Sequence, residues 1–284
     1  MTALNFSKAA FTAIIKLENF CSPREFMVAA DRIMTAGDTD LKAALAVSEA
    51  YNALMCEAVL SPMTVEFETE KARLFIRPGQ RGTRLLIGFT GRAFRFMMPL
   101  AIFQQSLPCD TDLLVLYDSA NDHYRSGIFD GKSTLFDLPR LLWPIMDQYS
   151  SIISFGTSGG AFPAVRFGKI AQVQRGISVG GRVINDAIRV FKGTGLAPAF
   201  DPICDCYKET AGQSWLMFGD QHTADVRSAQ IAAASIGAEL IAVMGSAEHN
   251  LLWPIYKAGR LDTFLDLLLD PNSTTTALRR FLAG

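Results

Sequence analysis

The stretch Ser154-Phe155-Gly156-Thr157-Ser158-Gly159-Gly160-Ala161-Phe162 contains the pattern Gly-x-Ser-x-Gly between an apolar run and a segment with helical periodicity. A serine hydroxyl is a weak nucleophile, and it becomes reactive at an exposed strand-to-helix turn where a histidine can take its proton. Such a turn strains the serine backbone and crowds its neighbours, which favours glycine two residues before and after it. The pattern therefore predicts a strand ending at Phe155, a helix beginning near Gly159, and Ser158 as a nucleophile.

The same stretch has a second interpretation. A glycine-rich turn in front of a helix binds phosphate through the backbone N–H groups of the helix N-terminus. The Gly-Lys-Ser/Thr ending of a P-loop is absent, which excludes that form of phosphate site. The position of one histidine favours the nucleophile over the phosphate site.

The chain has three histidines, His123, His222 and His249. His249 follows the last expected strand by a short loop and precedes a C-terminal helical pattern. An imidazole in this loop is able to swing toward Ser158. We therefore predict that His249 takes the proton of Ser158. His222 is assigned no role, and no metal site is predicted.

Two carboxylates, Asp220 and Asp225, follow the preceding expected strand. Either is able to accept the Nδ1 proton of His249 and hold the imidazole in the required tautomer. We favour Asp225 because it comes directly before a helical run, and a helix N-cap there is compatible with the catalytic role. Asp220 is the alternative acid.

The loop after the third expected strand reads Gly88-Phe89-Thr90-Gly91-Arg92, and its second glycine lets the backbone fold back toward the nucleophile. Backbone N–H groups at such a place stabilise the oxyanion of an acyl intermediate. We predict the N–H groups of Gly159 and Thr90 as these donors. Arg92 and His123 are candidates for substrate binding, against the plainer interpretation that both are solvated surface residues.

Short runs rich in valine, isoleucine, leucine and phenylalanine alternate with amphipathic helical patterns along most of the chain. Period-two alternation over residues 64–68 and 72–76 predicts an antiparallel hairpin. Continuous apolar runs then predict strands buried on both faces, over residues 84–89, 113–117, 152–155, 176–179, 215–218 and 240–244. Helices are expected over residues 96–105, 135–149, 161–171, 225–236 and 251–269. This order predicts an α/β fold with a mostly parallel central sheet and helices on both faces.

An N-terminal helical segment, residues 1–61, is expected to precede the α/β domain, residues 62–284. The run Ser22-Pro23-Arg24-Glu25 combines an N-cap serine, a proline at the first helical position and an early glutamate, so a helix should begin there. An alanine-rich helix is expected over residues 39–59. This segment is also the candidate surface for a protein partner.

The composition narrows the class of protein. Hydrophobic residues make up 49% of the 284 residues, which supplies a sizeable core. The formal net charge is -1 and no basic run occurs, which argues against nucleic acid as a partner. No stretch approaches the roughly 20 apolar residues that span a bilayer. Without an export signal or cysteine pairs at metal-ligand spacing, a cytoplasmic protein is expected.

From Met63 onward the chain resembles the α/β-hydrolase superfamily, and its serine esterases in particular. The resemblance is carried by the serine turn at residues 156–160, the acid region Gly219 to Asp225 and the placement of His249. The loop Asp118 to Gly131 is similar to loops of bacterial hydrolases. In this superfamily an insertion after the sixth strand commonly forms a cap, which implies a cap at residues 182–210.

The resemblance implies a serine hydrolase that cleaves an ester, thioester or amide of a small-molecule acyl substrate through an acyl-enzyme, without metal or organic cofactor. The same Ser-His-Asp set serves an acyltransferase, in which an acceptor hydroxyl replaces water. A non-catalytic binding or scaffold protein of the same fold is the third interpretation. The chain departs from the superfamily pattern in its undecided acid and in the loop at Thr90, which lacks the His-Gly-Gly-Gly form of many lipases.

Overall fold

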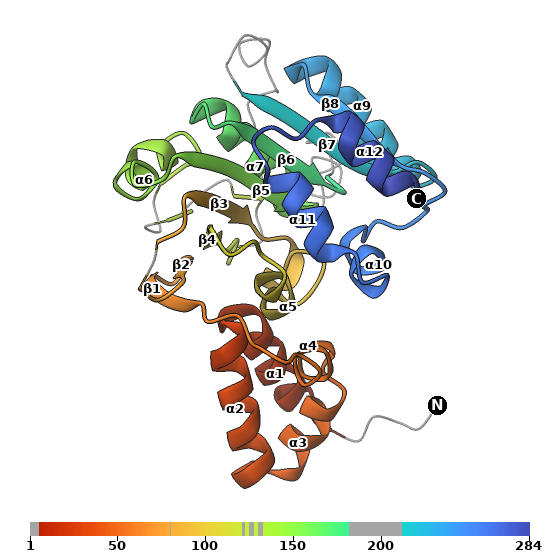
Figure 1. Ribbon diagram of the computed structural model, residues 1–284. Coiled ribbons are helices and arrows are strands. Elements are labelled where there is room, and N and C mark those ends of the chain that lie inside the picture. Colours follow the sequence, from red (N-terminus) through yellow and green to blue (C-terminus); the bar gives the residue numbers. More distant parts are fainter. Residues whose placement is uncertain (1–5, 80, 121–122, 125–127, 130–132, 182–211) are drawn as a thin grey trace.

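The computed structural model describes residues 6–79, 81–120, 123–124, 128–129, 133–181 and 212–284 (Figure 1). Its centre is an eight-stranded sheet in the order β1-β2-β4-β3-β5-β6-β7-β8. The strands are β1 Thr64–Glu68, β2 Ala72–Ile76, β3 Arg84–Phe89, β4 Thr111–Leu116, β5 Ser151–Thr157, β6 Arg175–Val179, β7 Gln213–Gly219 and β8 Glu239–Val243. Strand β2 runs antiparallel to its neighbours β1 and β4, and all pairs from β4 to β8 are parallel. This is the α/β-hydrolase fold, as the sequence predicted.

Helices cover both faces of the sheet (Figure 1). One face carries α5 Leu100–Gln105, α10 Leu252–Lys257, α11 Leu261–Leu269 and α12 Thr275–Ala283, and the other carries α6 Leu138–Met146, α7 Ala161–Ile170 and α9 Thr223–Ile236. Side chains of one strand alternate between the two layers. In β7, Trp215 and Met217 belong to the first layer, and Leu216 and Phe218 to the second.

Two expected helices are interrupted in the structure. The expected helix over residues 96–105 begins only at Leu100, because Met97 has a left-handed backbone (φ 61) and Pro99 disfavours helical geometry in the residue before it. The expected helix over residues 251–269 is two helices, α10 and α11, separated at Gly259, whose φ of 66 ends the first one. The periodicity continued across both breaks, so the sequence pattern did not reveal them.

The N-terminal helical segment consists of α1 Lys8–Phe20, α2 Pro23–Ala36, α3 Thr39–Ala46 and α4 Glu49–Leu54. Helix α2 begins where it was expected, and Ser22 and Glu25 form a capping box there. The expected helix over residues 39–59 is divided because the Ser48 side chain accepts the N–H of Tyr51 and starts α4. The segment lies beside α5 (Figure 1), and its apolar side chains join the core cluster of the α5 face of the sheet.

The expected cap at residues 182–210 lies outside the described residues. Within the described part of the chain, no helix is long and apolar enough to cross a membrane.

Candidate active site

The predicted site residues converge at the edge of the sheet where the parallel strands end. Ser158 follows β5 directly, Asp225 lies in the first turn of α9 after β7, and His249 follows β8. The carboxyl ends of parallel strands meet at one edge, so residues far apart in sequence come together there. The loop that follows β3 reaches the same edge.

The serine turn has the strained geometry that its sequence pattern predicted. Ser158 has a left-handed backbone with φ 51 and begins a short 3₁₀ turn, η2 Ser158–Gly160, that leads into α7. At Gly156 a Cβ atom would lie 2.1 Å from the carbonyl oxygen of Gly160, a contact that no side chain permits. The strand and the helix therefore approach each other closely enough to present Ser158 at the tip of the turn.

Ser158, His249 and Asp225 form a continuous hydrogen-bonded line. The Ser158 Oγ atom lies 3.0 Å from His249 Nε2, and His249 Nδ1 lies 2.7 Å from Asp225 Oδ2. The Asp225 side chain is fully buried, whereas 30% of the His249 side chain is exposed. A buried carboxylate on Nδ1 fixes the tautomer in which Nε2 is free to accept the serine proton.

The two candidate acids have different contacts. Asp225 bonds His249, as described above, whereas Asp220 Oδ1 accepts the backbone N–H of Ser246 at 3.1 Å. Ser246 belongs to the short loop that carries His249. The structure thus brings Asp225 to the histidine, and Asp220 holds the loop in place.

His222 is a neighbour of the acid that the sequence reasoning left without a role. Its Nδ1 atom lies 3.2 Å from Asp225 Oδ2 and 3.3 Å from the Asp225 backbone nitrogen, and it caps α9. The sequence feature that indicates this contact is a histidine three residues before an acid at the start of a helix. The ligand atoms of His222, Asp225 and His249 lie within 4.8 Å of one another, but a cation there would displace the contact between Asp225 and His249.

The structure contradicts Thr90 as an oxyanion donor. Its backbone N–H donates to the carbonyl oxygen of Leu116 at 3.2 Å, so the pairing of β3 with β4 extends one residue beyond the strand and occupies this group. The Thr90 side chain is buried and bonds Leu116 as well. The N–H of Gly159, by contrast, lies in the first turn of a helical segment, where backbone N–H groups have no partner within the helix.

The loop after β3 passes directly over the nucleophile. A Cβ atom on Gly91 would lie 2.8 Å from the carbonyl oxygen of Thr157 and 3.2 Å from the Cβ atom of Ser158. The next residue, Arg92, is exposed and begins a short 3₁₀ turn, η1 Arg92–Phe94. Glycine at position 91 is therefore required by the closeness of the two backbones.

His123 lies beside Gly159 of the serine turn. A Cβ atom on Gly159 would lie 3.6 Å from His123 Nδ1, which is ordinary van der Waals contact. The backbone N–H of His123 donates to Asp118 Oδ2 at 2.8 Å, and the buried hydroxyl of Tyr124 donates to the carbonyl oxygen of Leu116 at 2.7 Å. These bonds hold the imidazole beside the turn.

Backbone strain is concentrated around the site. Seven described residues other than glycine have positive φ angles: Ala93, Phe94, Met97, His123, Tyr124, Ser158 and Gln172. All but Gln172 follow the carboxyl ends of β3, β4 and β5. Strain of this kind persists only where surrounding contacts enforce it, and it clusters at functional sites.

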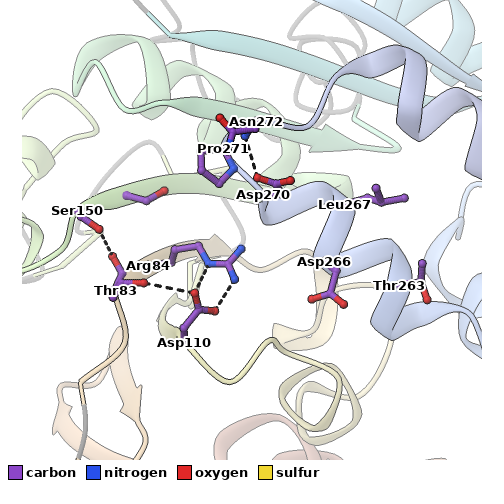
Figure 2. Close-up of a pocket in the computed structure, with 11 residues that line it drawn as sticks. Thr83, Arg84, Asp110, Ser150, Thr263, Asp266, Leu267, Asp270, Pro271 and Asn272 are labelled. Carbon is purple, nitrogen blue, oxygen red and sulfur yellow. Dashed lines mark hydrogen bonds and ion pairs between the residues drawn. The ribbon is translucent and has the colours of Figure 1, made fainter.

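A separate cavity lies at the opposite edge, where the strands begin. It has a volume of about 560 Å³ and is lined by the start of β3 and β5 and by α11 and the residues after it (Figure 2). Arg84 and Asp110 point toward each other there. Burial raises the pKa of Asp110, but the hydrogen bonds and charge of Arg84 outweigh burial and leave this pKa below its usual value.

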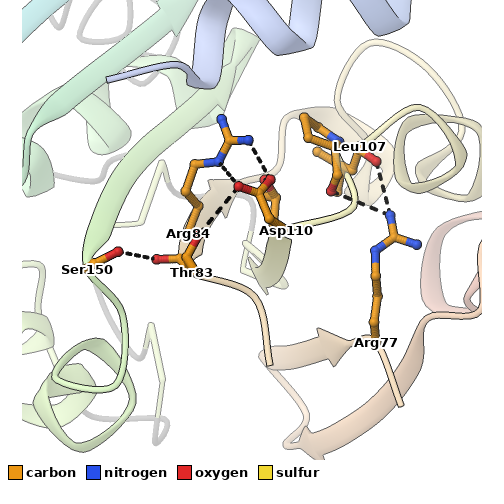
Figure 3. A network of polar contacts seen from close by, with 8 residues as sticks. Arg77, Thr83, Arg84, Leu107, Asp110 and Ser150 are labelled. Atoms are coloured by element: carbon orange, nitrogen blue, oxygen red, sulfur yellow. Dashed lines mark hydrogen bonds and ion pairs between the residues drawn. The ribbon is translucent and has the colours of Figure 1, made fainter. Parts of the chain in front are cut away.

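The hydrogen bonds around this cavity join loops of the backbone. The Ser150 hydroxyl donates to the carbonyl oxygen of Thr83 at 3.0 Å, and Arg77 donates to the carbonyl oxygen of Leu107 at 3.0 Å (Figure 3). They tie the loops before β3, β4 and β5 together. The predicted site residues do not line this cavity.

No model of a known protein family and no curated protein sequence matches the chain. Among solved structures, Est1E from Butyrivibrio proteoclasticus is 14% identical with a TM-score of 0.45, over 78% of this chain and 98% of that chain. A serine hydrolase homologue from Coxiella burnetii is 13% identical with a TM-score of 0.45, over 76% and 100% of the two chains. The capsule O-acetyltransferase of Neisseria meningitidis serogroup A is 11% identical with a TM-score of 0.47, over 74% and 96%.

Proposed function

We propose that this protein is a serine hydrolase that cleaves an ester, thioester or amide through an acyl-enzyme. Ser158 is the nucleophile, His249 the general base, and Asp225 the acid that orients His249. The observation that supports this most directly is the line of two short contacts, 3.0 Å from Ser158 to His249 and 2.7 Å from His249 to Asp225. A strained serine in a strand-to-helix turn supports the same role.

In the proposed reaction, Ser158 Oγ attacks the acyl carbonyl while His249 Nε2 takes its proton. The carbonyl π electrons move to the oxygen, and the imidazolium that forms is stabilised by the Asp225 carboxylate. Collapse of the intermediate breaks the bond to the leaving group, which takes the proton from His249. A water molecule then gives a proton to His249 and attacks the acyl carbon. The bond from this carbon to Ser158 Oγ breaks, and Oγ takes the proton from His249, which releases the acid and restores the enzyme.

The oxyanion forms on the side of the turn that carries the backbone N–H of Gly159. That N–H is one donor in our proposal, and Thr90 is not, because its N–H is bonded to Leu116. His123 lies against the same glycine, so we assign it a contact with the acyl substrate. Arg92, exposed on the loop over Ser158, is the proposed contact for an anionic part of the substrate.

Labelling of the purified protein with a fluorophosphonate, read by peptide mass spectrometry, tests this proposal. We expect modification at Ser158 and its loss in Ser158→Ala and His249→Ala. Ser150→Ala is the matched control, because Ser150 is an exposed serine at the opposite edge of the sheet and should leave labelling unchanged. An unlabelled Ser158 in folded protein would favour a non-catalytic protein of this fold.

The acceptor separates hydrolysis from acyl transfer. The same three residues serve both reactions, since a hydroxyl compound replaces water in the second half of the cycle. If release of the leaving group from an activated ester is independent of added alcohols and sugars, the protein is a hydrolase. A product that appears only with an acceptor identifies an acyltransferase.

A further inference from the structure

The loop of residues 91–98, here called the Gly91 loop, lies against the nucleophile and bonds the residue that follows the base in the chain. Gly91 lies against Ser158, as described above. At its other end, the carbonyl oxygen of Met97 accepts a hydrogen bond from the Asn250 side chain at 2.6 Å, next to His249 in the chain. The Met97 side chain and the His249 ring both pack at Gly180, where a Cβ atom would lie 2.6 Å from Met97 Cε and 3.3 Å from His249 Cε1. The position of this loop therefore sets the geometry of the site.

The Gly91 loop has few internal contacts that hold it in this shape. Ala93, Phe94 and Met97 have positive φ angles, which are unfavourable for residues with a side chain. The N–H of Gly91 donates to the carbonyl oxygen of Arg95 at 3.0 Å, which closes the loop on itself. A strained backbone needs further contacts from outside to stay in place.

Those contacts come from the end of α1 in the N-terminal helical segment. Asn19 Nδ2 donates to the carbonyl oxygen of the strained Ala93 at 3.2 Å, and Asn19 Oδ1 accepts the N–H of Leu100, the first residue of α5, at 3.2 Å. One amide side chain thus bonds the middle of the loop and the helix that follows it. Asn19 is 1% exposed, so water does not compete for these bonds.

Glu18 holds the same loop through its charge. Its carboxylate lies 3.1 Å from Arg95 Nη2 and accepts the Ser48 hydroxyl at 2.7 Å, and the residue is 2% exposed. A carboxylate in the last turn of a helix is disfavoured by the helix dipole, and a buried carboxylate is costly unless it is paired. Arg95 supplies that pairing, and the carbonyl oxygen of Arg95 is the one that bonds Gly91.

Aromatic packing continues the contact. Phe20, the last residue of α1, stacks on Tyr117 with ring centroids 4.6 Å apart and meets Phe94 of the loop edge-on at 5.5 Å. The Tyr117 hydroxyl donates to the carbonyl oxygen of Asn19 at 3.2 Å. Polar and apolar contacts therefore fix the end of α1 and the loop as one unit.

We propose that the end of α1 holds the Gly91 loop over Ser158, with Asn19 and Glu18 as positioning residues for the reaction. This rests on the proposed function for its effect on catalysis, but the hold on the loop is separate from it. The N-terminal helical segment is then a working part of the active site within its own chain. A surface for another protein is not needed to explain its presence.

The test compares Asn19→Ala and Glu18→Gln with the control Asn52→Ala in the full chain. Asn52 is a matched control because its side chain also bonds a backbone carbonyl in the helical segment, that of Ala46 at 3.1 Å, but it is exposed and does not touch the loop. Glu18→Gln keeps the side-chain volume and serves if Asn19→Ala does not fold. Thermal unfolding identifies the folded variants.

Two quantities are measured on each folded variant: hydrogen–deuterium exchange of the peptide that covers residues 91–98, and the fluorophosphonate labelling rate at Ser158, separated into the maximal rate and the half-saturating concentration. We expect exchange about tenfold faster in Asn19→Ala and several-fold faster in Glu18→Gln, because each variant loses hydrogen bonds that oppose local opening of the loop. The maximal labelling rate should fall by similar factors with little change in half-saturation. Asn52→Ala should match the unsubstituted protein in both.

Each outcome decides the proposal. Unchanged exchange in both position-18 and position-19 variants overturns the hold of α1 on the loop. Faster exchange with an unchanged maximal labelling rate overturns the positioning role. If the unsubstituted protein is not labelled at all while exchange still accelerates in Asn19→Ala, the proposed hydrolase activity fails and the hold on the loop is supported.

Discussion

Replacement of Asp225 by asparagine tests the polar line at the site with the least change of shape. Asp225 is fully buried and lies 2.7 Å from His249 Nδ1, while its second oxygen has no hydrogen-bond partner among the described residues. If the new amide nitrogen at position 225 faces His249, the imidazole must take the Nε2–H tautomer, which cannot accept the Ser158 proton. If the amide oxygen faces His249, a donor is buried without a partner, which costs about 1–3 kcal/mol of stability.

Either orientation removes the negative charge that stabilises the imidazolium. Loss of this acid in a comparable Ser-His-Asp site lowers the rate by about 10⁴, which corresponds to about 5.4 kcal/mol in the activation free energy. We therefore expect the labelling rate of Ser158 by a fluorophosphonate to fall by about four orders of magnitude in Asp225→Asn. Thermal unfolding should show a folded protein.

Asp220→Asn is the matched control. Its amide oxygen still accepts the Ser246 N–H, so labelling should stay within about twofold of the unsubstituted protein. Similar labelling of the Asp225→Asn variant and the unsubstituted protein would refute the assignment of the acid. So would a loss in Asp220→Asn as large as the loss in Asp225→Asn.

Three further predictions concern the glycine over the nucleophile, the pH dependence of stability and a buried arginine. Gly91→Ala should abolish labelling of Ser158, because its Cβ atom would lie 2.8 Å from the carbonyl oxygen of Thr157 and 3.2 Å from the Cβ atom of Ser158. Labelling of the folded variant at the rate of the unsubstituted protein would contradict this. Burial raises the pKa of Glu18 above its ordinary 4.5, and Ser48 and Arg95 oppose this only in part. The folded protein therefore binds a proton at Glu18 more tightly than the unfolded chain does. The stability that this proton contributes is lost as pH rises through the raised pKa. When urea unfolding is followed between about pH 4 and 7, the free energy of unfolding should fall less in Glu18→Gln than in the unsubstituted protein. Equal dependence of this free energy on pH in the two proteins would exclude a raised pKa at Glu18. Arg175→Met should lower the free energy of unfolding by about 3 kcal/mol. The buried guanidinium donates to the carbonyl oxygens of Leu268, near the end of α11, and of Ser273, after that helix, and it lies 3.6 Å from the centre of the Trp215 ring. A loss below about 1 kcal/mol in urea unfolding would contradict a stabilising role for Arg175.

The fold was predictable from the sequence because each strand and helix leaves a pattern among residues that are neighbours in the chain. The alternation of apolar runs and helical periods, with a hairpin in front, was sufficient for the mostly parallel sheet, and the turn at Ser158 was recognisable from five residues. His249 was predicted from its place after the last strand, and Asp225 was favoured over Asp220 because it comes directly before a helical run. Each of these inferences depends on residues that are close in sequence.

The parts that the sequence did not predict depend on contacts between distant segments. Thr90 was assigned a free N–H because the extension of β3 pairing to Leu116 follows from the three-dimensional register. Glu18 and Asn19 have the composition of an ordinary polar helix end, and only the fold brings them to Ala93 and Arg95. Glu18 is an acid in the last turn of α1, where the helix dipole disfavours negative charge. This unfavourable placement was the sequence feature that indicated a distant partner for its carboxylate.

The left-handed backbone around Ser158 also bears on how this protein would change under selection. The exposed Ala93 holds a conformation that glycine adopts without strain, so Ala93→Gly removes a local cost of roughly 1–2 kcal/mol, whereas Phe94→Gly would also remove the packing against Phe20. A screen for heat resistance alone would favour Ala93→Gly, and this change would loosen the segment that lies over Ser158. Thermal tolerance and the geometry around Ser158 are thereby opposed at this position, and a variant that gains the first is expected to lose the second.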